Sequence, residues 1–130
     1  MVDEAVTPGE EGPTVTDGLA LATASVDRVI VVTAKGTVDA LTAPRLTAAL
    51  DEALAEAPHA VIADLSEVDF LASAGMSVLI EAHGKAADSV RFGVVADGPA
   101  TSRPMKLVGI HEIVPLYETL DEAMRTVGDA

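Results

Sequence analysis

Two short segments of the chain, AVIADL (60–65) and VRFGVVA (90–96), are apolar almost throughout. Runs of this length and composition are typical of strands that are buried on both faces of a parallel sheet. Amphipathic helical patterns flank them in the sequence, which is the arrangement expected of parallel crossover connections. The sequence therefore predicts an α/β fold in which helices pack on a mixed β-sheet.

An antiparallel hairpin is predicted ahead of this parallel part. Residues 19–25 alternate, with Leu19, Leu21, Thr23 and Ser25 on one face, and residues 28–36 are rich in β-branched side chains. A turn near Asp27 would join the two strands.

The first helix is predicted to begin at Thr42, as its N-cap, and to end near Ala57. Pro44 falls in its first turn, where a missing N–H costs little, and Pro58 stops it. Apolar side chains recur at helical spacing at Leu46, Ala49, Leu50, Ala53, Leu54 and Ala57.

Four further elements complete the predicted order β-β-α-β-α-β-α-β-α. They are a helix over 74–88, a short helix from Ala100 to about Val108 ended by Gly109, a weak edge strand over 112–117 and a closing helix over 120–127. Residues 1–17 carry five acids, no base and no apolar periodicity. We therefore expect a disordered acidic tail at 1–17 and one folded domain over 18–130.

Composition restricts the class of protein. The chain is 49% hydrophobic but only 2% aromatic, which predicts an aliphatic core. Its 21 acids and 8 bases give a formal net charge of −13, which disfavours binding to nucleic acid or to an anionic membrane surface. No cysteine, signal peptide or membrane-spanning run is present in the sequence, so we expect a soluble cytoplasmic protein.

Common catalytic and ligand-binding motifs are missing from the sequence. The three histidines, His59, His83 and His111, are too scattered for a metal site, and no phosphate-binding glycine loop or hydrolase elbow occurs. Asp64 and Asp69 could act as an acid–base pair, but loop carboxylates near strand ends are common. We therefore expect no catalytic residue, no metal and no cofactor.

Two loop segments remain as candidates for function, KGTVDALTAP (35–44) and DLSEVDFLASAG (64–75). If strand 60–65 is parallel to its neighbours, the segment after it opens at the carboxyl edge of the sheet, where sites of open α/β sheets tend to lie.

The helix predicted over 74–88 orients Ser73. Its apolar stripe would be Met76, Leu79, Ile80, His83 and Ala87, and its polar stripe Ser77, Glu81, Lys85 and Asp88, with Glu81 and Lys85 able to pair. Extended back by one turn, the polar stripe reaches Ser73, which should face solvent between two alanines. Ser73 is then either an N-cap or a phosphorylation switch at a helix N-terminus.

Several motifs in the right order resemble the STAS domain family, specifically the bacterial anti-sigma factor antagonists. Gly36-Thr-Val-Asp39 with Thr42-Ala-Pro44 is similar to the family's G-E-L-D…T-A-P loop. Asp64-Leu-Ser66, Val68-Asp-Phe70 and Ser73-Ala-Gly75 are similar to its D-L-S…V-x-F-x-D-S-S/A-G stretch. Val108-Gly109-Ile110 and Thr119-Leu-Asp-Glu-Ala123 extend the resemblance over roughly residues 19–127.

This resemblance implies a protein that binds an anti-sigma factor with serine kinase activity and thereby releases a sigma factor. Phosphorylation of Ser73 by that kinase would end binding, and a phosphatase would restore it. The expected partner-binding residues are Asp39, Thr42, Ala72, Ser73, Ala74, Gly75 and Ser77, with Ser77 as a second possible phosphate acceptor.

The sequence departs from the family pattern beside Ser73. Ala72 stands where the family often has aspartate, and Ala74 replaces a frequent second serine. A scaffold or ligand-binding module of a stress-sensing or lipid-transport assembly is therefore the alternative function. Gly75 is small either because a partner approaches closely or because the helix packs tightly on the sheet.

Overall fold

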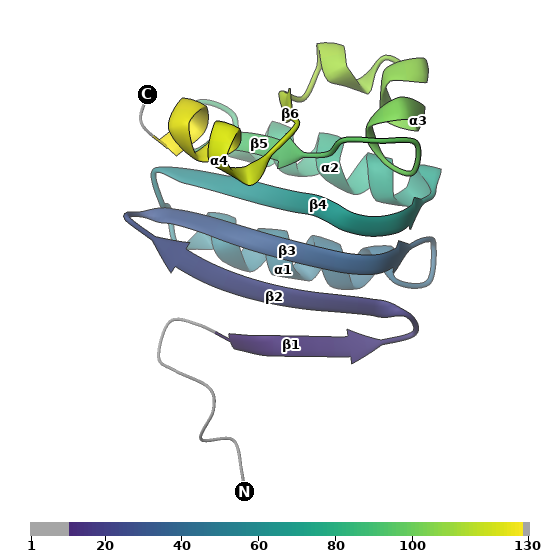
Figure 1. The fold of residues 1–130 in the computed structure, drawn as a ribbon. Helices are drawn as coiled ribbons and strands as arrows, with labels where there is room; N and C mark the ends of the chain where they lie inside the picture. Colours follow the sequence, from purple (N-terminus) through teal and green to yellow (C-terminus); the bar gives the residue numbers. More distant parts are fainter. Residues whose placement is uncertain (1–10, 129–130) are drawn as a thin grey trace, which may run out of the picture.

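A six-stranded mixed sheet forms the centre of the computed structural model, which describes residues 11–128 (Figure 1). The strands lie in sequence order, and β1-β2-β3 are antiparallel while β3 to β6 are parallel. Their bounds are β1 (Glu11–Thr16), β2 (Leu19–Val26), β3 (Val29–Val38), β4 (Ala60–Leu71), β5 (Arg91–Val95) and β6 (Leu116–Tyr117). The predicted α/β class and the hairpin before the parallel part are confirmed.

Helices cover both faces of this sheet. Figure 1 shows α1 (Ala43–Ala55) and α2 (Ser73–Ala86) behind it and α4 (Leu120–Ala123) in front. The remaining helical segments are α3 (Ser102–Leu107), the 3₁₀ turn η2 (Ile110–Glu112) and the π-helical turn η3 (Met124–Gly128). Helix α1 ends before Ala57, whose φ of 52° is left-handed, because residues that precede a proline avoid the helical conformation.

The core is aliphatic, as its composition predicted, and lies on both faces of the sheet. The larger cluster fills the space between the sheet and α1 and α2; its members include Leu46, Leu50, Val61, Leu79 and Phe92. A smaller cluster lies under α4 and η3 and includes Val29, Val31, Ile62 and Val127. Burial on both faces explains the apolar composition of β4 and β5.

The predicted acidic tail over 1–17 is wrong for residues 11–16. These residues form β1, which pairs with β2 through an Asp17–Gly18 turn in which both residues have a positive φ. An Arg45 Nη1 donates to the carbonyl oxygens of Thr16 at 3.0 Å and Leu19 at 2.9 Å. Backbone pairing and the arginine contacts hold β1 at the edge of the sheet, and apolar periodicity is not needed for it. The rest of the predicted tail, residues 1–10, lies outside the described residues.

Two other strands differ in length from the prediction. The strand predicted over 60–65 continues to Leu71, because β3 extends beside it as far as Val38. The predicted edge strand over 112–117 shortens to β6, because the chain turns through η2 and only Leu116 and Tyr117 pair with β5.

Helix α2 packs on the sheet with a face slightly different from the apolar stripe that the sequence predicted. Its buried residues are Gly75, Val78, Leu79, Ala82 and Ala86, while the predicted members Met76, Ile80 and His83 are half-buried and Ala87 is exposed. The polar stripe is confirmed as exposed. Lys85 does not pair with Glu81, however, because its ammonium contacts Asp51 of α1 at 2.8 Å and ties the two helices together.

Candidate functional site

The carboxyl ends of β3 and β4 bring the two candidate loops together. The parallel register pairs Val38 with Leu71, the last residue of each strand. The next N–H along, that of Ala72, donates to the Val38 carbonyl oxygen at 2.8 Å. The turn that begins at Asp39 and the helix that begins at Ser73 therefore leave the sheet side by side, at the edge where the sequence predicted a site.

The turn Asp39–Thr42 is fixed by its own side chains. Asp39 Oδ1 accepts hydrogen bonds from the N–H groups of Leu41 and Thr42, each at 3.0 Å. The Thr42 hydroxyl accepts from the Asp39 N–H at 2.9 Å and donates to the Thr37 carbonyl oxygen at 3.0 Å. These bonds satisfy the backbone of the turn, so the loop keeps one shape without a partner.

Thr42 occupies the N-cap position of α1, as predicted, but its hydroxyl makes no capping bond to the helix. The turn uses the hydroxyl instead, and Thr42 is fully buried at 0% exposure. Thr42 therefore shapes the loop from inside, and its side chain offers no surface to another protein.

Ser73 is the first residue of α2 and is exposed to solvent, as the wheel predicted. The N-cap is Ala72, so the interpretation of Ser73 as a capping serine is wrong. The Ser73 hydroxyl makes no hydrogen bond with any residue in the range 11–128, and no side chain caps the helix. The first turn therefore retains N–H groups and a positive dipole end that are available to an anion.

The neighbours of Ser73 are small for different reasons. Ala72 and Ala74 are half-buried and leave the hydroxyl unshielded, and Ser77 is exposed one turn further along. Gly75 is buried, and a Cβ there would lie 2.6 Å from both Leu71 Cδ1 and Val38 Cγ1. Close packing of α2 on the sheet thus explains the glycine.

Two large apolar side chains are exposed on the segments that carry Asp39 and Ser73, and this exposure was not predicted from the sequence. Leu41 in the turn is 67% exposed, and Phe70 near the end of β4 is 53% exposed. Phe70 is one of only two phenylalanines in the chain, and this scarcity was the available signal. Exposed apolar groups beside a functional residue are typical of protein–protein contact sites.

The residues set aside as candidates for other chemistry have structural environments. Asp64 is buried and accepts from the Ser66 N–H at 3.0 Å, whereas Asp69 is exposed and accepts from the Thr37 hydroxyl at 3.5 Å. Within residues 11–128, no cluster of histidines and carboxylates could hold a metal ion. None of the helices in that range is long and apolar enough to span a membrane.

Comparison with known proteins identifies the family and the fold. The family model described as the STAS domain matches residues 20–123. The chain belongs to the STAS domain family. Within that family it is similar to the anti-sigma-F factor antagonist RsfB of Mycobacterium tuberculosis, with 38% identity over 111 residues that cover 85% of this chain and 91% of the relative.

Solved structures agree with this assignment. The crystal structure of an anti-sigma factor antagonist from Mycobacterium paratuberculosis is 40% identical and superposes with a TM-score of 0.83, covering 89% of this STAS chain and 99% of the other. The unphosphorylated anti-sigma factor antagonist SpoIIAA shares the fold at 18% identity, with a TM-score of 0.70 over 85% of this chain and 98% of SpoIIAA.

The resemblance to anti-sigma factor antagonists that the motifs indicated is therefore confirmed. An antagonist acts by binding, and this relationship supports the prediction that the STAS chain is a regulatory protein and not an enzyme.

Proposed function

We propose that this STAS protein binds an anti-sigma factor with serine kinase activity, in the cytoplasm, and so releases a sigma factor. Phosphorylation of Ser73 by the bound kinase ends the interaction, and a phosphatase restores it. The observation that carries the proposal is the exposed Ser73 hydroxyl, which has no hydrogen-bond partner within residues 11–128 and stands at the start of α2.

The position of Ser73 suits a kinase. Its hydroxyl does not have to leave a hydrogen bond, and the alanines on either side leave room for a nucleotide phosphate to approach. Ser77 is exposed too, but it lies inside α2, so the helix would have to unwind before Ser77 entered a kinase site. We therefore propose Ser73 as the acceptor.

A phosphate on Ser73 is compatible with the fold. The first turn of α2 contains no acidic residue, and the positive end of the helix dipole favours an anion there by about 0.3–1 kcal/mol. The same group adds a charge of roughly −2, which a closely packed protein interface would have to desolvate. Phosphorylation should therefore change partner binding while leaving the domain folded.

The proposed contact surface consists of residues that are at least partly accessible. It comprises Asp39, Ala72, Ser73, Ala74 and Ser77, together with the exposed Leu41 and Phe70. Thr42 and Gly75 support this surface from below, because both are buried. Their substitution should act through the shape of the turn and the seating of α2.

The test needs the natural partner, which an adjacent gene for a kinase-type anti-sigma factor would identify. The purified STAS protein is incubated with that kinase and ATP, and its mass is measured. We expect one phosphate on the wild type and on the Ser77→Ala control, and none on Ser73→Ala, which should still bind the kinase. Phosphorylation of Ser73→Ala to the wild-type extent would contradict the proposal.

A further inference from the structure

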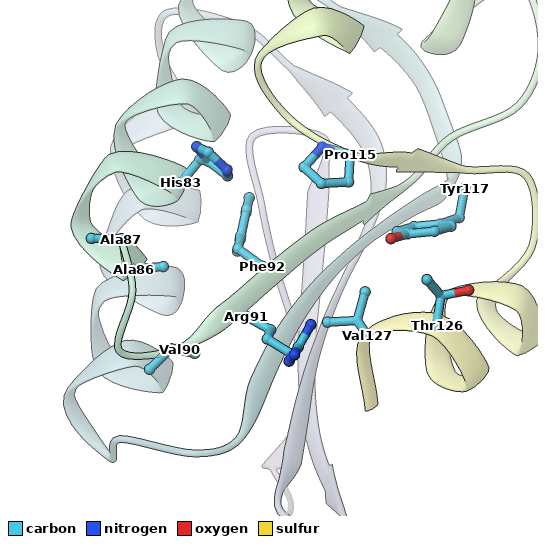
Figure 2. Close-up of a pocket in the computed structure, with 10 residues that line it drawn as sticks. All are labelled: His83, Ala86, Ala87, Val90, Arg91, Phe92, Pro115, Tyr117, Thr126 and Val127. Atoms are coloured by element: carbon cyan, nitrogen blue, oxygen red, sulfur yellow. The ribbon is translucent and has the colours of Figure 1, made fainter. Parts of the chain in front are cut away.

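A pocket of about 220 Å³ lies at the end of the sheet opposite to Ser73 (Figure 2). It is bordered by the last turns of α2, the start of β5, β6 and η3. Arg91 at the start of β5 pairs with Ala60 at the start of β4, so this is the amino end of the parallel strands. The pocket is therefore separate from the proposed anti-sigma factor surface.

The pocket forms where the edge of the sheet is uncovered. Strand β6 pairs with β5 only at Val94 and Val95. The Arg91 N–H donates towards β4, to His59, and the Val94 N–H donates towards β6, to Pro115. The backbone N–H and C=O groups of successive residues in a strand point alternately to the two neighbouring strands. Those of Phe92 therefore point to the side on which β6 lies, but Phe92 precedes Val94, where the pairing with β6 begins.

Two polar side chains, Tyr117 and Arg91, line this space. Figure 2 shows the Tyr117 hydroxyl directed from β6 towards β5 and the Arg91 side chain extending towards Val127. Neither the hydroxyl nor the guanidinium makes a hydrogen bond or ion pair with any residue in the range 11–128.

Most of the other lining residues are apolar, and two of them, Phe92 and Val127, are buried in the core. The His83 ring meets Phe92 edge-on with centroids 6.4 Å apart. A Cβ on Gly93 would lie only 2.9 Å from the Tyr117 ring, so the glycine allows that ring to lie flat against β5. The hydroxyl position is thereby fixed by the fold.

Burial raises the pKa of Tyr117, with the nearby Glu122 carboxylate adding to the effect and Arg91 opposing it. The hydroxyl therefore stays protonated at neutral pH and remains a hydrogen-bond donor. The guanidinium and the Phe92 N–H are further donors on this side of the pocket, beside the Phe92 carbonyl oxygen, which accepts.

We propose that this pocket binds a small organic carboxylate with a short apolar body, held by Arg91 and Tyr117. The planar guanidinium matches a carboxylate in a paired geometry, and the Tyr117 hydroxyl adds a further donor. The apolar body would lie against Phe92, Pro115 and Val127, which line the pocket.

The chain has one tyrosine and no tryptophan, so its fluorescence reports on Tyr117 alone. Isovalerate, hexanoate and phenylacetate are titrated into the full chain, with isovaleramide as the uncharged control. Binding of the two aliphatic acids is measured by tyrosine fluorescence. Binding of all four compounds is measured by the shifts of the backbone amide NMR signals of Phe92 and Gly93. We expect saturable binding of at least one acid with a Kd of about 1 mM or tighter, and at least about tenfold weaker binding of the amide.

Arg91→Gln should weaken the binding by about tenfold or more, while Arg103→Gln, the same change at an exposed arginine of α3, should leave it unaltered. Circular dichroism checks that both variants keep the fold. The proposal is overturned if none of the three acids binds saturably up to about 20 mM, if isovaleramide binds as well as isovalerate, or if Arg91→Gln binds like the wild type.

Discussion

Two buried residues, Gly75 and Thr42, hold the start of α2 and the neighbouring Asp39 loop in place. Gly75 lets α2 approach the last residues of β3 and β4, and the Thr42 hydroxyl closes the loop that begins at Asp39. The exposed Ser73 thus depends on a rigid support made of buried neighbours.

Gly75→Ala should destabilise the domain by about 1–3 kcal/mol, because its methyl group would overlap Leu71 and Val38, each 2.6 Å from the new Cβ. Gly84→Ala is the matched control in the same helix. No atom lies within 4 Å of a Cβ at Gly84, so alanine there should stabilise by about 0.5–1 kcal/mol through helix propensity. Urea unfolding measures both. Equal stability of Gly75→Ala and the wild type would show that α2 does not pack as described.

At the scale of elements, the contact between β5, β6 and η3 determines the environment of Tyr117. Burial raises the pKa of this phenol above its ordinary value of 10.0. The neutral phenol therefore contributes to the free energy of unfolding. This contribution is complete below pH 10.0 and is lost as the pH rises through the folded-state pKa. Because Tyr117 is the only tyrosine, the ultraviolet absorbance of the phenolate titrates it directly.

We expect an alkaline midpoint above 10.0 in the native protein and a return to the ordinary value in denaturant. Gly93→Ala, which would push the ring away from β5, should shift the native midpoint towards the ordinary value. Identical midpoints in native and denatured protein would mean that β6 leaves Tyr117 in water.

The sequence predicted elements better than their contacts. Continuous apolar runs identified β4 and β5, and glycine and proline marked most helix ends, because these signals are local. The buried face of α2 was displaced from the predicted one because the packing of Gly75 turns the helix towards the sheet. The ion pair of Lys85 with Asp51 was not predicted, because the approach of Asp51 depends on how α1 and α2 pack together.

For the whole molecule, β1 is part of the sheet and not of a separate tail. Two truncated chains are compared, one that starts at residue 11 and keeps β1, and one that starts at residue 18 and lacks it. A chain that starts at residue 18 should lose about 1–2 kcal/mol, because Arg45 loses the Thr16 carbonyl and β2 becomes an open edge. Urea unfolding of the two truncated chains distinguishes the boundaries. Equal free energies of unfolding of the two chains would show that β1 does not contribute to the stability of the domain.

The site as a whole was predictable where it follows from strand direction. Parallel β3 and β4 place Asp39 and Ser73 at one edge of the sheet. The polar stripe of the predicted helix correctly indicated that Ser73 faces solvent. The burial of Thr42 and the exposure of Leu41 and Phe70 were missed, because each depends on the three-dimensional course of the loop.

The central claim is that the phosphorylation state of Ser73 controls partner binding. Its most direct test is the Kd of the anti-sigma factor for unmodified protein and for protein phosphorylated at Ser73, with Ser73→Ala as the unmodifiable control. We predict wild-type affinity for Ser73→Ala and at least about tenfold weaker binding after phosphorylation, a difference of about 1.4 kcal/mol. Equal affinities of the phosphorylated and unmodified proteins would contradict the account.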